Sequence, residues 1–189
     1  MPELNLTASS PLGGLEMQYA GVLLSEVTDL ALVSIAIPLG GRPALEREMA
    51  VRFNVGLPDC GQSTVTTDGM LQFLGMQIDQ LFALFEYSCN DAVSTISGEL
   101  GKTAYFTDQT DSWAMLRIAG PMTRMALERI CPLDLHPDRF SQGAVARTTM
   151  EHLAVIVLRT DQDSFTLMSP RSSAISFLHA VETSIENVL

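Results

Sequence analysis

The order of apolar segments predicts an α+β fold that is built around a split βαβ, or ferredoxin-like, unit. Strand-like and helix-like patterns alternate in the first part of the chain, and strand-like runs separated by short polar turns then lead to a C-terminal helix. The chain has 189 residues, of which 47% are hydrophobic, so it can build a sizeable core. We expect an N-terminal arm over residues 1–28 and a single domain over 29–189. The βαββαβ unit should cover about 29–119, and a helix, an antiparallel meander and a final helix about 120–189.

The first half of the predicted unit begins with a strand at Leu30–Ile37. A helix follows from Pro43, because proline suits the first helical turn, and its apolar side chains recur with a spacing of four residues at Leu45, Met49 and Phe53. The stretch 56–69 is rich in turn-forming residues, which predicts a loop. Two strands joined by a short turn are then expected at 70–75 and 81–85.

The second half of the unit begins with a helix after Asn90, whose side chain suits a helix N-cap. Gly101 suits the position just past the end of that helix. The apolar runs Thr103–Thr107 and Trp113–Ile118 predict two strands or one bent strand, interrupted by the polar residues 108–112.

The remaining residues predict a helix, a meander and a last helix. The helix should cover Pro121–Ile130, because Pro132 disfavours helical geometry at the residue before it. Strands are expected at 144–149, 153–158 and 165–168. The C-terminal helix should begin near Ser172 and bury one apolar stripe, which comprises Ile175, Leu178, Val181, Ile185 and Val188.

Charge and composition exclude several classes of function. The formal net charge of −11 disfavours binding to nucleic acid or to an anionic membrane surface, because such binding depends on Lys and Arg. No apolar run approaches the roughly 18 residues that cross a membrane, and the N-terminus has no signal-peptide pattern, so we expect a cytoplasmic protein. The 3 cysteines are an odd number without C-x-x-C spacing, which argues against a disulfide framework.

Two groups of residues could carry chemistry. Cys131, Asp134 and His136 are metal-ligating types, but they are fewer than the four ligands of a closed zinc site, so we favour a structural loop. Asp108 and Asp111 could act as a carboxylate pair or form turns through their side chains, and we favour turns.

From about Leu30 onwards, the sequence resembles the gamma subunit of heterotetrameric sarcosine oxidase. The resemblance rests on the T-D-Q-T-D phrase at Thr107–Asp111, Gly120-Pro121, C-P-L-D-L-H-P at Cys131–Pro137, and P-R-S at Pro170–Ser172. It implies a fold like the folate-binding part of the glycine-cleavage T-protein. It also implies a structural role, in the interface or the framework, for the motif residues Gly120, Pro121, Cys131, Pro132, Asp134, His136 and Arg171.

The resemblance further implies a complex that demethylates sarcosine oxidatively to glycine and passes the one-carbon unit to tetrahydrofolate. FAD, FMN, NAD and zinc would belong to partner subunits, and this chain would hold no cofactor or metal and have no catalytic residue. Its partners would be the alpha, beta and delta subunits, mainly alpha. Three alternatives remain. The complex could act on a related amine such as dimethylglycine or N-methylglutamate, the chain could be a stand-alone folate-binding aminomethyltransferase with Asp108 and Asp111 as pterin contacts, or it could form a homo-oligomer.

Overall fold

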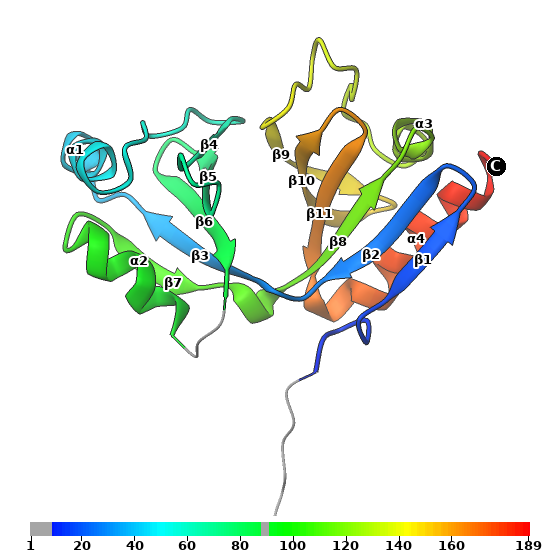
Figure 1. Ribbon diagram of the computed structural model, residues 1–189, viewed down its shortest axis with the longest axis horizontal. Coiled ribbons are helices and arrows are strands. Elements are labelled where there is room, and N and C mark those ends of the chain that lie inside the picture. The colour runs from blue at the N-terminus through cyan, green and yellow to red at the C-terminus, as the bar shows by residue number, and fades with distance from the viewer. Residues whose placement is uncertain (1–8, 88–90) are drawn as a thin grey trace, which may run out of the picture.

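The computed structural model describes residues 9–87 and 91–189, and it contains two antiparallel sheets with helices on their outer faces (Figure 1). The first sheet has the strand order β4-β5-β6-β3-β7. Its strands are β3 (Leu30–Ala36), β4 (Ser63–Val65), β5 (Leu71–Gln77), β6 (Gln80–Glu86) and β7 (Tyr105–Asp108), and its helices are α1 (Arg42–Phe53) and α2 (Ala92–Leu100).

The second sheet has the strand order β1-β2-β8-β11-β10-β9. Its strands are β1 (Glu16–Tyr19), β2 (Val22–Val27), β8 (Trp113–Ala119), β9 (Val145–Met150), β10 (Leu153–Asp161) and β11 (Ser164–Pro170). Its helices are α3 (Thr123–Glu128) and α4 (Ala174–Glu186), and two short 3₁₀ turns are η1 (Thr110–Ser112) and η2 (Arg171–Ser173). The predicted α+β class and the predicted meander are confirmed.

The first sheet has the predicted ferredoxin-like order, since β3, α1, β5, β6, α2 and β7 follow one another along the chain while the strands lie in the order β5-β6-β3-β7. Leu45 and Met49 of α1, and Ile96 of α2, are buried against this sheet. Gly101 follows α2 as predicted, with φ of 61° and its N–H donating to Ser97 O at 2.9 Å. The N-cap predicted at Asn90 lies outside the described residues, and Asp91 caps α2 by accepting from Ser94 N at 3.0 Å.

Three expectations need correction. Residues 1–28 are not simply an arm, because β1 and β2 form a hairpin in the second sheet, with Val22 and Leu24 buried. The apolar Leu23 between those two residues obscures their period of two. The expected loop at 56–69 contains the short edge strand β4. Finally, β7 and β8 belong to different sheets, so the first unit ends before residue 119.

The C-terminal helix also differs in one position. Phe177, Val181 and Ile185 define its buried face, but the side chain of Ile175 is 75% exposed. At 3.6 residues per turn, Ile175 lies about 200° around the helix from Phe177 and therefore faces away from the sheet.

The second sheet repeats the topology of the first in a permuted form. The segments β8, α3, β10, β11 and α4 follow one another as β3, α1, β5, β6 and α2 do, and each set has the same spatial order. The fourth strand of the second set is β2, which comes from the N-terminal side of the chain, and β9 extends this sheet as β4 extends the first. The fold is therefore an internal repeat that the sequence itself does not reveal.

The two sheets pack face to face, which gives four layers in the order helices, sheet, sheet, helices (Figure 1). Leu32, Phe82 and Leu84 of the first sheet pack with Met115, Ile156 and Met168 of the second. Within the described residues, 9–87 and 91–189, no helix is both long and apolar enough to span a bilayer.

Candidate functional site

The motif segment begins where β8 ends at a close approach between two backbones. Gly120 has φ of 126°, and a Cβ atom there would overlap the carbonyl oxygen of Gly21. Met122 N donates to that same carbonyl at 3.1 Å, and Gly120 N donates to Asp163 O at 2.9 Å. Gly120 is therefore needed for backbone packing between the β1–β2 turn and the start of α3.

Pro121 precedes α3, which is shorter than the predicted helix over Pro121–Ile130. Hydrogen bonds continue beyond α3, because Cys131 N donates to Leu127 O at 2.8 Å. The chain then leaves the helix at Pro132, as the restriction that proline places on the preceding residue predicts.

The predicted metal-ligand types in this segment do different things. Cys131 is buried in the core beneath α3 and α4, and burial raises the pKa of its thiol. The Asp134 carboxylate accepts from His136 N at 3.0 Å, which closes a turn. The His136 imidazole is half-exposed and lies 3.5 Å from the Asp138 carboxylate. In the described part of the chain, no group of three or more His, Cys, Asp and Glu side chains is arranged to hold a metal ion.

Arg159, on β10, forms hydrogen bonds to the backbone of the motif segment. No pattern in the sequence indicated this role. Its side chain is only 2% exposed. One terminal nitrogen, Nη1, donates to Leu135 O at 3.1 Å and to Phe140 O at 2.7 Å. Nε donates to Asp161 O at 3.1 Å, and Nη2 donates to Gln162 O. The guanidinium carbon lies 5.1 Å from the centroid of the Phe165 ring, which adds a cation–π contact.

A cleft of about 500 Å³ lies beside η1 and brings together the other predicted site residues. It is lined by Asp108 at the end of β7, Asp111 in η1, Trp113 at the start of β8, and Arg171 after β11. Asp108 accepts from Thr110 N at 2.9 Å, so one of the two carboxylates forms the turn that the sequence predicted. Thr110 Oγ1 in turn accepts from Leu32 N at 3.1 Å, which fixes η1 to the first sheet.

Arg171 connects this cleft to the N-terminal segment. Its Nη1 lies 3.6 Å from the Asp111 carboxylate, and its Nη2 donates to Ser9 O. Asp111 is almost fully exposed, so the ion pair is screened by solvent. The indole N–H of Trp113 is buried without a hydrogen-bond partner in the described structure, and its ring meets Phe82 edge-on at 6.4 Å between centroids. The cleft therefore combines a charged rim with an aromatic wall.

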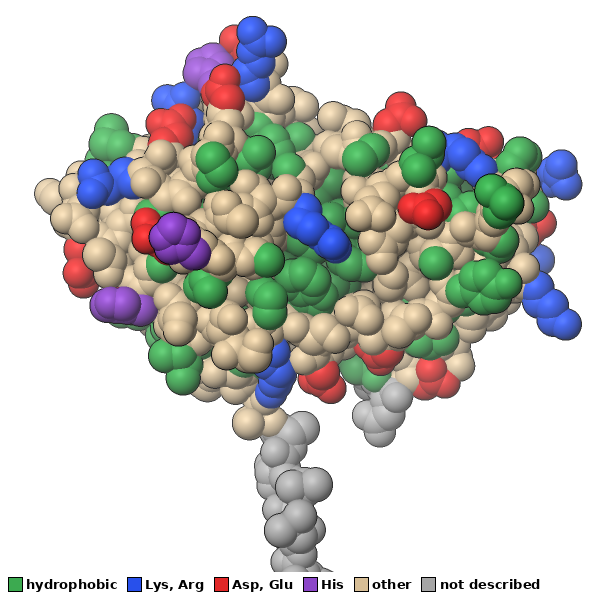
Figure 2. All heavy atoms as spheres, turned by 180° about the vertical axis from the view of Figure 1, so that it is seen from behind, with side chains coloured by type: hydrophobic (Ala, Val, Ile, Leu, Met, Phe, Trp, Pro, Cys, Tyr) green, Lys and Arg blue, Asp and Glu red, His purple; other side chains and the backbone are tan. Residues whose placement is uncertain are grey.

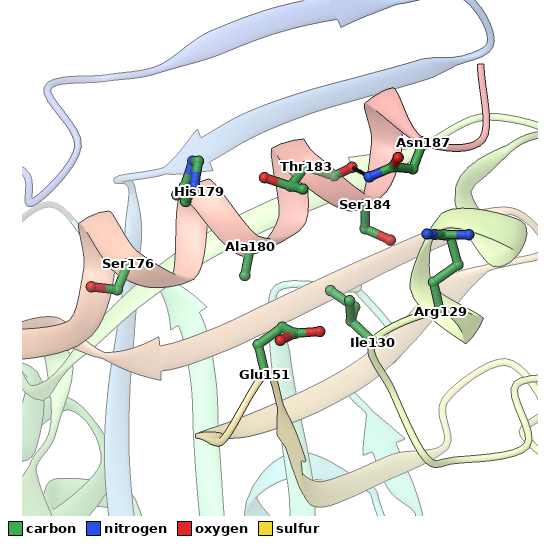
Figure 3. Close-up of a pocket in the computed structure, with 9 residues that line it drawn as sticks. All are labelled: Arg129, Ile130, Glu151, Ser176, His179, Ala180, Thr183, Ser184 and Asn187. Atoms are coloured by element: carbon green, nitrogen blue, oxygen red, sulfur yellow. Dashed lines mark hydrogen bonds between the residues drawn. The ribbon is translucent and has the colours of Figure 1, made fainter.

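A second pocket, of about 400 Å³, lies between α4, the end of α3 and the β9–β10 turn (Figure 3). Ser184 Oγ on its floor donates to Ala126 O at 2.6 Å, and Asn187 Nδ2 donates to Thr183 O at 2.7 Å. Figure 3 shows His179 pointing away from Glu151, so these two titratable side chains do not converge on one point. The polar groups of this pocket thus form hydrogen bonds between α4 and α3 and at the end of α4 itself.

No model of a known protein family matches the chain. Subunit gamma of sarcosine oxidase from an Arthrobacter species is 26% identical over 147 residues, which are 76% of this chain and 70% of that protein. Subunit gamma from Corynebacterium sp. strain U-96 is 29% identical over 82 residues, or 43% of this chain and 40% of that protein. The alignment with the Corynebacterium relative thus covers less than half of either chain.

Solved structures give the same answer for the fold. A chain of heterotetrameric sarcosine oxidase from Corynebacterium sp. U-96 matches with a TM-score of 0.75 at 23% identity, covering 88% of this chain and 84% of that one. The resemblance to sarcosine oxidase subunit gamma is confirmed. The glycine cleavage system aminomethyltransferase T from Bartonella henselae matches with a TM-score of 0.63 at 13% identity, covering 86% of this chain and 45% of that one. The gamma-like chain therefore has the predicted T-protein-like fold.

Proposed function

We propose that this chain is the gamma subunit of a heterotetrameric sarcosine oxidase complex and that it acts in assembly rather than in chemistry. The observation that carries the proposal is the similarity to subunit gamma over 147 residues, together with the fold match to a chain of the heterotetrameric enzyme. The complex would work in the cytoplasm and demethylate sarcosine oxidatively to glycine, with transfer of the one-carbon unit to tetrahydrofolate. A complex for dimethylglycine or N-methylglutamate is the close variant of this proposal.

The proposal assigns FAD, FMN, NAD and zinc to the alpha, beta and delta partners, with alpha as the main contact of this chain. The roles of the motif residues support a structural part for this subunit. Gly120 permits a close backbone approach, Asp134 closes a turn, and the Cys131 thiol is packed in the core. A catalytic thiol instead needs a lowered pKa and access to substrate, whereas burial raises the pKa of Cys131.

Affinity purification of the tagged chain from its native cell tests this assignment. We expect a complex with flavin absorbance that contains the three partner chains and turns over sarcosine, while the purified chain alone gives no turnover. Dimethylglycine and N-methylglutamate, assayed in parallel, distinguish the amine substrates. Turnover of sarcosine by the isolated chain would refute the assembly role, and a colourless single species would refute the complex.

Folate binding by the isolated chain is a second candidate, favoured by the cleft beside η1. Its volume of about 500 Å³ lies within the usual range for small-molecule sites. Asp111, Trp113 and Arg171 could contact a pterin there. Titration with a reduced folate would detect this activity, and the variant Asp111→Asn should weaken it. Absence of binding at millimolar folate would eliminate this candidate and leave the assembly role unaffected.

A further inference from the structure

The segment between α3 and β9 projects from the body of the molecule as a loop (Figure 1). Its end is formed by four consecutive exposed residues, His136, Pro137, Asp138 and Arg139, which we call the tip. Figure 2 shows acidic, basic and histidine side chains gathered on a protrusion of the rear face. The tip is therefore an exposed polar projection from the body of the molecule.

Both ends of the tip are anchored in the core. Leu135 before it is fully buried, and Phe140 after it is 7% exposed. Arg159 donates to the carbonyl groups of both residues, and the Phe140 ring stacks on Phe165 with 6.5 Å between centroids. Inside the tip, Arg139 N and Phe140 N both donate to His136 O, at 2.9 and 2.8 Å. The conformation of the tip is therefore fixed before any partner binds.

Anchoring the tip in this way costs desolvation free energy at Arg159. A guanidinium is removed from water without a carboxylate partner among the described residues, and its donors are used on backbone carbonyls around the base of the tip. Within the described residues, the His136 imidazole contacts only Asp138, and the Arg139 guanidinium forms no hydrogen bond or ion pair. Rigid presentation of polar groups to solvent reduces the entropy that binding would otherwise lose.

We propose that the tip is a preformed docking element that inserts into a polar recess of a partner subunit. The recess would carry an Arg or Lys side chain opposite Asp138 and a carboxylate opposite Arg139. A second copy of this chain is disfavoured as the occupant, because each copy has a net charge of −11 and the copies repel. This inference rests on the proposed function, since it names the surface through which an assembly subunit would reach its partner.

A charge swap tests the proposal without changing composition or net charge. In the double variant Asp138→Arg with Arg139→Asp, both pairs across the interface become repulsive. We expect association with the flavin-containing subunits to weaken by about tenfold or more, because close interfacial charge pairs contribute strongly to affinity. The matched control is Glu46→Arg with Arg47→Glu, an exposed acid–base pair on α1, which should assemble as the wild type does.

The melting temperature of each purified variant separates docking from folding. Should the swap lower it, the neutral variant Asp138→Asn with Arg139→Gln replaces the swap in the same assay. A photo-cross-linking residue at position 138 should attach to a partner subunit of the assembled complex, and one at position 47 should not. Wild-type affinity in the folded swap variant, or a cross-link between two copies of this chain, would overturn the inference alone. A wild-type chain that purifies without flavin would overturn the proposed function as well.

Discussion

Gly120→Ala is expected to destabilise the protein strongly, because two independent penalties act at this position. A φ of 126° is a conformation that residues with a Cβ rarely adopt, and such strain costs about 1–3 kcal/mol. The added methyl would also lie 3.0 Å from the carbonyl carbon of Gly21 and 3.3 Å from Cα of Val22, and would overlap the Gly21 oxygen. Overpacking of this kind costs about 1–3 kcal/mol, so we expect a total of roughly 2–6 kcal/mol.

Urea unfolding of the purified protein measures this loss. With a slope of about 2 kcal/mol per molar, the midpoint should fall by roughly 1–3 M. Gly98→Ala is the matched control, because Gly98 lies exposed within α2 and a Cβ there would meet nothing within 4 Å. That substitution should raise stability by about 0.5–1 kcal/mol. Equal midpoints for Gly120→Ala and the wild type, at equal slopes, would refute the argument from backbone contact.

Four further predictions concern the core around the motif segment. Arg159→Met should lower the free energy of unfolding by about 2–4 kcal/mol, because the carbonyls of Leu135 and Phe140 lose their donor, and should make the tip sensitive to protease; an uncleaved tip would contradict the anchoring role. Ser184→Ala should cost about 1–2 kcal/mol in urea unfolding through loss of the bond to Ala126 O, whereas the exposed Ser176→Ala should change stability by less than about 0.5 kcal/mol. In a Cys89→Ser background, a thiol reagent should modify the exposed Cys60 quickly and the buried Cys131 only slowly. Because the pKa of the Cys131 thiol is raised, its reaction should accelerate only at a pH above the ordinary thiol range. Equal reaction rates for both thiols at neutral pH would contradict this. Cys131→Ser should reduce stability by about 1–3 kcal/mol yet leave turnover per assembled complex unchanged, and normal assembly with lost turnover would instead indicate a chemical role.

The same raised pKa makes stability depend on pH in a defined direction. In the folded state the Cys131 thiol favours its protonated form more strongly than in the unfolded chain. Its contribution to stability is therefore complete below the unfolded thiol pKa and is lost as the pH rises through the higher folded value. Cys131→Ser should remove this dependence on the alkaline side, since a serine hydroxyl does not titrate there.

Local patterns predicted the elements well where apolar runs were continuous and bounded by turn residues. The strand at Leu30–Ala36 and the helix with Leu45 and Met49 on one face are of this kind. The hairpin before residue 28 was missed because its strands are short and Leu23 hides the alternation. The pairing of β2 with β8 could not be predicted either, because strand partners distant in sequence leave no local trace.

The candidate site was predicted less completely, for a similar reason. Asp108 was recognised as a turn former from its neighbours alone, and the structure places its carboxylate on Thr110 N. The pairing of Asp111 with Arg171 joins residues 60 positions apart, and no periodicity indicates it. The strand predicted at 153–158 stops one residue before Arg159, and no sequence pattern singled this arginine out. Its burial depends on the loop that folds over it, and the sequence gives no sign of that.

The motif segment must meet several packing requirements at once. Gly120 must lack a Cβ, Cys131 and Leu135 must be buried, and the carbonyls around the tip must receive the donors of Arg159. Each of these requirements is a packing requirement, and none by itself places a reactive group near a substrate. Substitutions in the anchors should therefore act through stability, whereas substitutions in the tip should act through assembly. The anchor variant Arg159→Met and the tip swap at Asp138 and Arg139 therefore separate the two roles in one protein.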